Sequence, residues 1–373
     1  MKAAWLFLAA LPLAAQPIHI AHPTIVIPPQ QDALGKPKGI FPAKMRVAYG
    51  FNQVANQGVG QTIGIVDAFD DPNIESDLGV FDTQFKLPSC TTANGCFTKI
   101  YATGTKPKTN GNWAAEISLD VEWAHAIAPQ AHIILVEAAG QSNAQLYQAV
   151  DVAVQNGATV VSMSWGTDEY STEVNDDSHF NVAHVTFVAA SGDSGHQSIY
   201  PAASPYVVAV GGTSLTIASN GAWQSETAWS GSGGGLSAYE PEPSYQAGVQ
   251  NNGFRGIPDV AYDADTKTGV PIYISVGIYG LLGWVEVGGT SMAAPQWSAL
   301  FAIANSMRAA QSKAPLSQVQ FDLYPIPGDY HDIVSGNNGS CGSQCTAGPG
   351  YDFVTGLGSP LANVVIPALV AAP

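Results

Sequence analysis

Residues 288–295 have the sequence Gly-Gly-Thr-Ser-Met-Ala-Ala-Pro and open an apolar helical pattern that continues to about Arg308. Ser291 therefore lies between a glycine turn and the first turn of a predicted helix. Backbone N–H groups at a helix N-terminus can bind a negatively charged oxygen, and the glycines let a substrate backbone come close. A serine here could also be a simple helix cap, but the complete string favours a nucleophile.

The chain before this serine alternates between short apolar runs and helical patterns. Buried strands are predicted at 62–66, 132–136, 159–163, 185–189 and 207–210, and helices at 42–48, 113–128 and 146–154. Such alternation is typical of a parallel sheet covered by helices on both faces. The Gly-, Ser- and Pro-rich residues 212–260 are predicted to be mostly loop. Because no linker divides the chain, we expect one α/β domain with a central, mostly parallel sheet.

Composition excludes some classes of function. The 373 residues include 29 Asp and Glu against 13 Lys and Arg, a net charge of −16 at pH 7. Nucleic-acid binding is therefore not expected, because a basic surface is missing. Charged residues make up only 11%, and a protein with few salt bridges loses little stability when acid protonates its carboxylates. Life at acid pH is one interpretation, and a neutral-pH protein with an uncharged polar surface is the other.

The N-terminus indicates export. Residues 1–15 contain one lysine followed by an apolar stretch, as in a secretory signal peptide. A short membrane anchor is the alternative, but no later apolar run is long enough to span a bilayer. We expect a secreted protein, extracellular or periplasmic. Residues 16–40, rich in Pro, Gln and His, are predicted to be a short unstructured leader before a domain at 41–373.

The four cysteines lie in two close pairs, Cys90 with Cys96 and Cys341 with Cys345. Zinc sites prefer two-residue spacings and histidine partners, which these pairs lack. Two local disulfides are therefore predicted, as is common in exported proteins.

Glu116 and Asp120 lie four residues apart on the predicted helix 113–128, so they share one face. Like charges at this spacing repel each other, and the helix around them is almost entirely apolar. A buried carboxyl pair is typical of a site where protons are shared or a cation is bound. The alternative is a solvated face, which is what we expect for Glu122.

Three motifs together resemble a known family. The string at 288–295 resembles the nucleophile motif of the subtilisin-like clan, but none of the eight histidines has the His-Gly-x-His setting of subtilisins. Glu116-x-x-x-Asp120, followed by Val-Glu-Trp-Ala-His-Ala-Ile-Ala-Pro, resembles the helix that replaces this His in sedolisins, the serine-carboxyl peptidases. Asp193, in Ala-Ala-Ser-Gly-Asp-Ser-Gly, is similar to the sedolisin oxyanion aspartate. The resemblance runs from about residue 41 to the C-terminus.

The resemblance implies a subtilisin-like fold and a monomeric, acid-acting serine endopeptidase that cleaves proteins or peptides. Ser291 would attack the peptide carbonyl, and Glu116 would take its proton and pass it to the leaving amine. Asp120 would orient Glu116. Protonated Asp193 would donate a hydrogen bond to the oxyanion, which requires acid or burial.

Two further positions match residues that support this site in the family. They are Asp67 in Ile-Val-Asp-Ala and Trp165 in Ser-Met-Ser-Trp-Gly. Asp67 could equally be a structural residue at a strand end.

The C-terminal region resembles the sedolisin calcium site. The resemblance implies one structural Ca²⁺, with side-chain oxygens from Asp332 and Asp352 and carbonyl oxygens from Ile333, Gly348 and Gly350. Carboxylates and carbonyls are the hard ligands that Ca²⁺ prefers.

The sequence departs from the family in the segment before the domain. Only about 25 residues separate the predicted signal peptide from the domain, which is too few for the folded prosegment that is usual in the family. This leaves open a catalytically weak, calcium-stabilised binding protein on the same fold. A tripeptidyl-type exopeptidase and a subtilisin using an unplaced histidine such as His125 are further alternatives.

Overall fold

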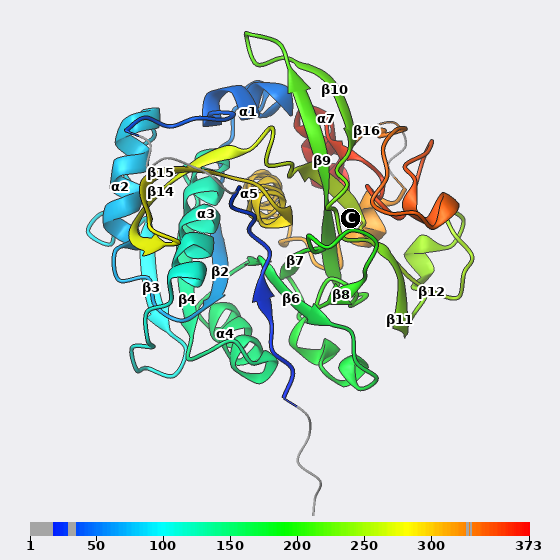
Figure 1. The fold of residues 1–373 in the computed structure, drawn as a ribbon, viewed down its shortest axis with the longest axis horizontal. Helices are drawn as coiled ribbons and strands as arrows, with labels where there is room; N and C mark the ends of the chain where they lie inside the picture. The colour runs from blue at the N-terminus through cyan, green and yellow to red at the C-terminus, as the bar shows by residue number, and fades with distance from the viewer. Residues whose placement is uncertain (1–17, 29–34, 326–327, 329) are drawn as a thin grey trace, which may run out of the picture.

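The computed structural model describes residues 18–28, 35–325, 328 and 330–373, so the predicted signal peptide at 1–15 lies outside the described residues. An eight-stranded sheet forms the centre, in the order β10-β9-β7-β5-β2-β4-β3 with β13 paired to β9 (Figure 1). Its strands are β2 (Thr62–Ala68), β3 (Phe97–Tyr101), β4 (His132–Ala138), β5 (Val160–Met163), β7 (Thr186–Ala190), β9 (Val207–Ile217), β10 (Trp223–Ala228) and β13 (Val260–Asp263). All neighbours are parallel except β10 with β9.

Helices cover both faces of this sheet. Helix α4 (Asn143–Gln155) packs on one face, and α3 (Gly111–Ile127) and α5 (Thr290–Ala309) pack on the other. The other helices are α1 (Pro42–Ala48), α2 (Ile74–Phe85), α6 (Gln320–Leu323) and α7 (Ala362–Ala371). Side chains alternate along each strand: Ile63 and Ile65 of β2 join the core formed with α3 and α5, whereas Val66 joins the core formed with α4. The predicted α/β fold with a mostly parallel sheet is confirmed.

Smaller sheets surround the centre. They comprise β1 (His22–Pro23), β6 (Trp165–Asp168) and β8 (Ile199–Tyr200); β11 (Gly235–Pro241) and β12 (Phe254–Ile257); β14 (Val270–Ile278) and β15 (Leu281–Val287); and β16 (Tyr330–His331) and β17 (Ser359–Pro360). The β14–β15 hairpin packs on α2 and α3 and leads directly into α5 (Figure 1). It thereby covers one side of α3, the helix that carries Glu116 and Asp120.

The prediction that 212–260 is mostly loop is wrong. Residues 212–217 continue β9, and β10, β11 and β12 follow. Gly211 and Gly212 are not turn residues but sites of close packing, since a Cβ would lie 2.6 Å from Pro258 and 2.7 Å from Ala264. The glycines allow β13 and its neighbours to approach β9, which single-sequence patterns cannot reveal.

The prediction that the leader, residues 16–40, is unstructured is also wrong for part of it. Within its described part, residues 22–23 form β1 and pair with β6. Figure 1 shows this dark-blue segment passing in front of α5 beside β6. The prediction gave more weight to the Pro, Gln and His content of the leader than to its β-branched residues Thr24–Ile27, and the strands that pair with this segment lie far away in the sequence.

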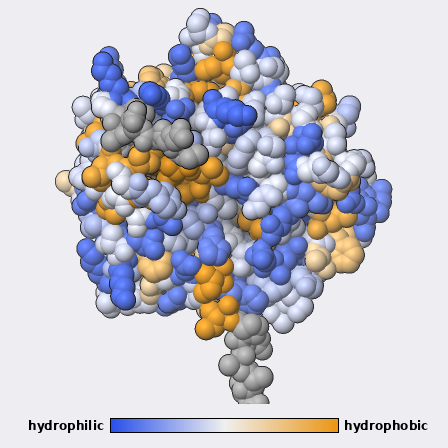
Figure 2. Space-filling model, viewed as in Figure 1, coloured by the Kyte–Doolittle hydropathy of each residue, from blue (hydrophilic) through white to orange (hydrophobic). Residues whose placement is uncertain are grey.

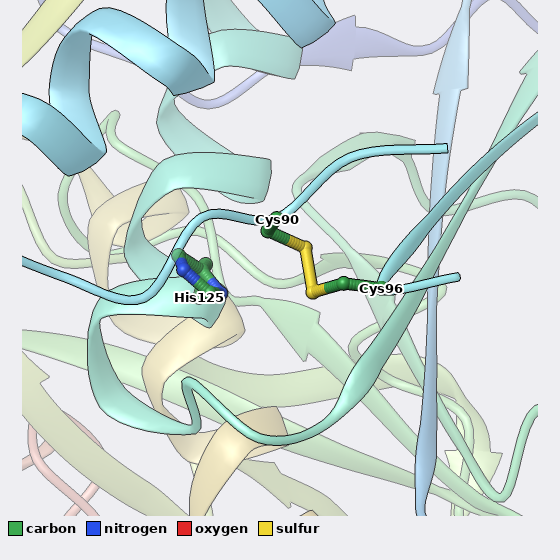
Figure 3. A group of neighbouring side chains, drawn as sticks. All are labelled: Cys90, Cys96 and His125. Carbon is green, nitrogen blue, oxygen red and sulfur yellow. A yellow bond between two sulfur atoms is a disulfide. The ribbon is translucent and has the colours of Figure 1, made fainter. Parts of the chain in front are cut away.

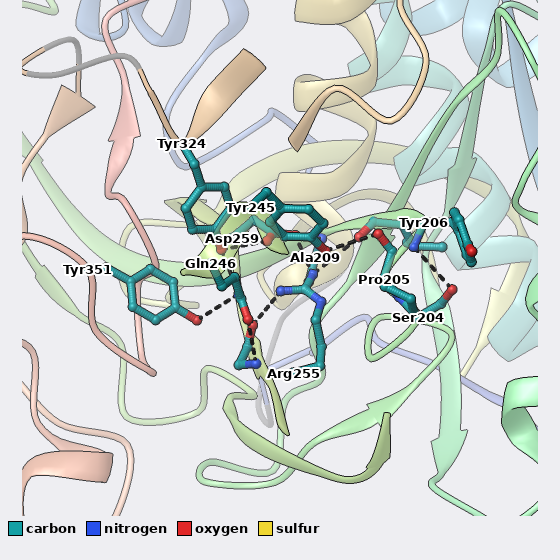
Figure 4. Close-up of polar contacts among 12 residues, drawn as sticks. Ser204, Pro205, Tyr206, Ala209, Tyr245, Gln246, Arg255, Asp259, Tyr324 and Tyr351 are labelled. Atoms are coloured by element: carbon teal, nitrogen blue, oxygen red, sulfur yellow. Dashed lines mark hydrogen bonds and ion pairs between the residues drawn. The ribbon is translucent and has the colours of Figure 1, made fainter. Parts of the chain in front are cut away.

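A buried polar network fastens β12 and β13 to β9 (Figure 4). Arg255 and Asp259 are both fully buried and form an ion pair of 2.6 Å. Asp259 also accepts hydrogen bonds from the Ala209 N–H and the Tyr324 hydroxyl, both at 2.8 Å. Because each carboxylate oxygen has a donor, the buried charge is compensated.

Both predicted disulfides, Cys90–Cys96 and Cys341–Cys345, are present. Figure 3 shows His125 beside the first of them. The sulfurs are bonded to each other and offer no thiolate for a metal. No helix in the described part of the chain has both the length and the apolar character needed to cross a membrane.

Candidate active site

Ser291 is the second residue of α5 and is fully buried. The preceding Gly289 has φ +103°, a conformation that favours glycine. A Cβ at this position would also collide with the Thr24 carbonyl oxygen and lie 2.6 Å from Asp193 Oδ2. Glycine is therefore required at this position, where the backbone of Thr24 and the carboxyl group of Asp193 approach the start of α5.

Helix α3 packs against α5 and carries Glu116 and Asp120, both fully buried. Burial raises the pKa of Glu116 well above its usual range, and repulsion from Asp120 and Asp67 adds to the rise. The nearby Ser291 hydroxyl partly offsets this rise in the pKa of Glu116. Neither Glu116 oxygen has a hydrogen-bond partner among the described residues, so this carboxyl group is available to a proton.

Asp120 is held from one side only. Its Oδ1 accepts a hydrogen bond of 2.7 Å from the Ser164 hydroxyl, and Oδ2 has no partner within the described ranges. Burial first, and then the charge of Asp67, raise the pKa of Asp120 well above normal. Ser164 was not singled out by the sequence, since a serine beside Trp165 carries no signal of its own.

Asp67 lies close enough to Glu116 and Asp120 to affect the pKa of both. It lies near the carboxyl end of β2, fully buried, and burial raises its pKa to about 8. Neither of its oxygens has a hydrogen-bond partner in the part of the chain that is described. Trp165 is buried next to it and donates from Nε1 to the Val66 carbonyl at 2.7 Å, which fixes the strand end that carries Asp67.

Asp193 follows β7 and reaches the start of α5. Its Oδ1 accepts from the Thr290 N–H at 2.7 Å and from the Thr290 hydroxyl at 2.9 Å. Oδ2 is buried and has no partner among the residues described. Burial raises the pKa of Asp193 to about 7, although the bonds from Thr290 oppose the rise. Below neutral pH the group is therefore protonated and able to donate a hydrogen bond.

Asp193→Asn is expected to change the alkaline limb of the pH–rate profile. The pKa of about 7 means that Asp193 donates below that pH and becomes a repelling charge above it, so the wild-type rate falls as pH rises through this range. An amide donates at every pH, so kcat/KM of the variant should decline less between about pH 6 and 8. Asp193→Ala, which has no donor, is the control and should be slow throughout. An unchanged limb in Asp193→Asn would contradict this role.

The N-terminal segment 18–28 lies in the cleft beside these residues. His22 pairs with Gly166 in antiparallel register. Farther back, the Ala21 N–H donates to the Gln141 carbonyl at 2.9 Å, and the Ala21 side chain is fully buried. The segment therefore lies along β6 as an added strand.

At the nucleophile the same segment is held by its backbone. The Thr24 N–H donates to the Ser164 carbonyl at 3.1 Å, and its carbonyl oxygen accepts from the Ser291 N–H at 3.2 Å. The Thr24 and Ser291 hydroxyls are 2.8 Å apart. Two residues on, Val26 and Gly288 exchange two backbone hydrogen bonds of 2.9 Å. These contacts mark how an extended chain passes Ser291.

Two other side chains on α3 differ from the residues that face Ser291. Glu122, predicted to be solvated, is fully buried and accepts from the Tyr273 N–H at 3.1 Å, because the β14–β15 hairpin covers that face. His125 lies nine residues after Glu116, about 13 Å along the helix. Its Nε2 donates to the Pro88 carbonyl at 2.8 Å, so it is not the base of a subtilisin-type triad.

Four of the five predicted calcium ligands are linked in pairs by hydrogen bonds in the C-terminal region. The Gly350 N–H donates to both oxygens of Asp332, at 3.2 and 3.1 Å, and the Gly348 N–H donates to Asp352 at 3.1 Å. No hydrogen-bond donor among the described residues contacts the carbonyl oxygens of Gly348, Gly350 or Ile333. Two carboxylates with such carbonyls nearby fit a hard cation.

Comparisons with known proteins agree with this geometry. The model of the subtilase family, Peptidase_S8, matches residues 102–320. Sedolisin of Pseudomonas sp. (strain 101) is 30% identical over 395 residues, and kumamolisin of Bacillus sp. (strain MN-32) is 33% identical over 376 residues. These alignments cover 93% and 90% of this chain. The chain spans 65% and 64% of the length of these two relatives.

A solved structure supports the same assignment. Pseudomonas sedolisin, a serine-carboxyl proteinase complexed with two molecules of pseudo-iodotyrostatin, superposes with a TM-score of 0.75 at 29% identity. The superposition covers 90% of this chain and 98% of that one. The chain therefore belongs to the subtilase family and, within it, to the sedolisin group of serine-carboxyl peptidases.

Proposed function

We propose that this chain is a secreted serine endopeptidase that hydrolyses peptide bonds of protein substrates at acid pH, acting as a monomer. The observation that carries the proposal is the placement of Ser291 at the N-terminus of α5, with the buried carboxyl group of Glu116 beside it and Asp193 at the same turn. A nucleophile, a proton acceptor and two oxyanion donors are thus available within one cleft.

The chemistry follows from these positions. Ser291 Oγ attacks the substrate carbonyl carbon while Glu116 takes the hydroxyl proton. The carbonyl oxygen becomes an oxyanion that accepts hydrogen bonds from the Ser291 N–H and from protonated Asp193. Glu116 then passes its proton to the leaving amine, and water hydrolyses the acyl-serine by the same route.

The carboxyl groups of Glu116, Asp120 and Asp67 titrate as a coupled set. Burial raises the pKa of each, and repulsion from neighbouring carboxyl groups adds to the rise for Glu116 and Asp120, so protons are shared among the three in acid. Asp120 and Asp67 thereby keep Glu116 basic enough to accept the serine proton. Asp193 must stay protonated at the same pH, which favours catalysis below its pKa of about 7.

The cleft favours internal cleavage over removal of tripeptides, although relatives include tripeptidyl-peptidase sed1 of Aspergillus fumigatus. If Thr24 marks the residue before the cleaved bond, a tripeptide would begin at His22, but segment 18–28 continues past that point in the cleft. The Ala21 N–H donates to the Gln141 carbonyl, and the ring centroids of His19 and Tyr170 are 3.7 Å apart. A tripeptidyl exopeptidase needs the cleft to be closed beyond the third residue before the cleaved bond.

Digestion of an unfolded protein at acid pH, with fragments identified by mass spectrometry, should give internal peptides of varied length. A product set of tripeptides alone would exclude an endopeptidase.

We further propose that a structural Ca²⁺ is bound by Asp332, Asp352 and the carbonyls of Ile333, Gly348 and Gly350. The ion would stabilise the loop between β16 and β17 and would take no part in the proton transfers. Its support is the convergence of both carboxylates on residues 348–350.

Calcium removal is expected to lower the melting temperature by several degrees. A ligand present at 100 times its dissociation constant stabilises a folded protein by about 2.7 kcal/mol. The measurement is thermal unfolding with CaCl₂ and with a chelator. In Asp332→Asn, which weakens one ligand on the exposed side, this difference should shrink strongly. An equal calcium effect in wild type and variant would argue against the site.

A further inference from the structure

We propose that Asn338, on a C-terminal loop, is a positioning residue for catalysis that holds the turn carrying Asp193, so that the Asp193 carboxyl group reaches the oxyanion. The inference rests on the proposed peptidase function and adds a residue that acts through Asp193. It is carried by two contacts of Asn338. One is a backbone hydrogen bond to the end of this turn, and the other is a side-chain hydrogen bond to the connection between β10 and β11.

The turn at residues 191–196 has little rigidity of its own. Gly192 directly precedes Asp193, Gly195 follows two residues later, and both glycines have positive φ angles, +106° and +75°. Glycine loses more conformational freedom on folding than any other residue. The position of the Asp193 backbone therefore depends on contacts from outside the turn.

Thr290 orients only one oxygen of the Asp193 carboxyl group. The Thr290 N–H and hydroxyl both donate to Oδ1, whereas Oδ2 has no partner among the described residues and is free to donate to the oxyanion when it is protonated. Such a donor must lie about 2.7–3.1 Å from the oxyanion. A small movement of the Asp193 backbone would therefore take Oδ2 out of reach.

The connection between β10 and β11 holds the turn on one side. The Gly195 N–H donates to the Gly231 carbonyl at 3.0 Å, and the Gly233 N–H donates to the Gly192 carbonyl at 2.6 Å. A Cβ on Gly233 would lie 1.9 Å from the Ser191 carbonyl oxygen. The two backbones are thus in direct contact, and a shift of the connection would move the turn.

Asn338 holds the turn on its other side. Its carbonyl oxygen accepts from the His196 N–H at 2.9 Å, and a Cβ on Gly195 would lie 2.6 Å from the same oxygen. The Asn338 side chain is buried, and its Nδ2 donates to the Ser232 carbonyl at 2.9 Å. One residue therefore bonds both to the turn and to the connection against which the turn packs.

The loop that carries Asn338 is polar and buries few side chains. Within residues 334–346 only Asn338 and Cys345 are buried, and Figure 2 shows mostly hydrophilic surface on the right-hand side, where this segment follows β16 in Figure 1. The Asn338 N–H donates to the Cys345 carbonyl at 3.0 Å, and the Cys341–Cys345 disulfide closes the loop. Because little apolar burial stabilises the loop, the place of the Asn338 backbone depends on its side-chain hydrogen bond and on this disulfide.

Asn338→Ala is expected to lower kcat by about ten-fold with little change in KM. The substitution removes the amide that fixes the loop, and a misplacement of about 1 Å can cost up to about 100-fold in rate. Complete loss of one oxyanion donor costs about 10²- to 10³-fold, so the effect should be smaller than that of Asp193→Ala. Asn337→Ala is the matched control, because Asn337 is exposed and makes no side-chain hydrogen bond among the described residues. Its kcat should stay within about two-fold of the wild type.

A double-mutant cycle distinguishes positioning from general damage to the cleft. In the Asp193→Ala background, Asn338→Ala should change kcat by less than about two-fold, because the group that Asn338 positions is already gone. A structural defect elsewhere in the cleft would cost the same factor in both backgrounds. Hydrolysis of a fluorogenic peptide mixture at acid pH is measured for the four proteins of the cycle, and thermal unfolding shows that each is folded.

Two further measurements do not depend on the activity of Asn338→Ala. The double variant Cys341→Ser/Cys345→Ser opens the same loop without altering Asn338, and its kcat should also fall several-fold, again only where the Asp193 carboxyl group is present. Amide hydrogen exchange followed by mass spectrometry should be faster for residues 191–196 in Asn338→Ala than in Asn337→Ala.

The outcomes separate the two proposals. An unchanged kcat in Asn338→Ala, an equal loss with and without the Asp193 carboxyl group, or unchanged exchange at residues 191–196 would overturn the inference and leave the peptidase function standing. If Asn338→Ala does not fold, the double cysteine variant decides the matter by the same comparison. A folded wild type that hydrolyses none of the peptides at acid pH would overturn both proposals.

Discussion

Ser291→Ala is expected to lower peptide hydrolysis by about 10⁴-fold or more while leaving the fold intact. The substitution removes only the hydroxyl, whose bonds are to Thr24 Oγ1 and, at 3.4 Å, to the Ser164 carbonyl. The backbone N–H that begins α5 remains, so the helix and one oxyanion donor persist. The loss is therefore chemical rather than structural.

Ser298→Ala is the matched control for this variant. Ser298 lies on the same helix and is also fully buried, and its hydroxyl donates to the Ala294 carbonyl of its own helix at 2.9 Å, its one side-chain hydrogen bond among the described residues. Its removal should leave kcat within about two-fold, because it does not touch the cleft. Activity at acid pH and thermal unfolding are measured for both variants. More than a few per cent residual activity in Ser291→Ala, or an equal loss in the control, would exclude Ser291 as the nucleophile.

Glu116→Gln is expected to lower kcat by about 10²- to 10⁴-fold, the usual contribution of a positioned acid–base group. Glutamine has nearly the same shape but cannot take up the serine proton. Because the side chain is fully buried next to α5, the near-identical volume keeps the packing of the two helices. KM should change much less than kcat, since the acceptor acts in the transition state.

The chain offers a close control for this variant on the same helix. Glu122 is equally buried, and burial raises its pKa too, but it faces the Tyr273 N–H. Glu122→Gln should keep kcat near that of the wild type, with any effect appearing in stability. If both variants lost activity equally, the result would indicate damage to α3 and not loss of a proton acceptor.

The parts that the sequence predicted correctly depend on local patterns. The five buried strands and the helices around them follow from apolar periodicity, and the observed ends differ by only a few residues except in β9. Glu116 and Asp120 are on one helix, so their common face follows from the helical period alone. Ser291 was found because a glycine turn and a helix start are adjacent in sequence.

What was missed depends on contacts between distant segments. Glu122 is buried by a hairpin some 150 residues later in the chain, as its bond to Tyr273 shows. The leader was predicted to be unstructured, although its partners, which include β6 and the turn at Gly288, are all far away in sequence. Such pairings carry no period that a single sequence displays.

In the proposed mechanism, carboxyl groups and not a histidine move the protons in this cleft. The rate of hydrolysis of an unfolded protein substrate by the wild type from about pH 2.5 to 8 tests this mechanism. We expect a maximum between roughly pH 3 and 5 and a decline as the pH rises toward and past 7, where Asp193 loses its proton. A maximum at neutral or alkaline pH, or a folded protein without activity at every pH, would contradict it.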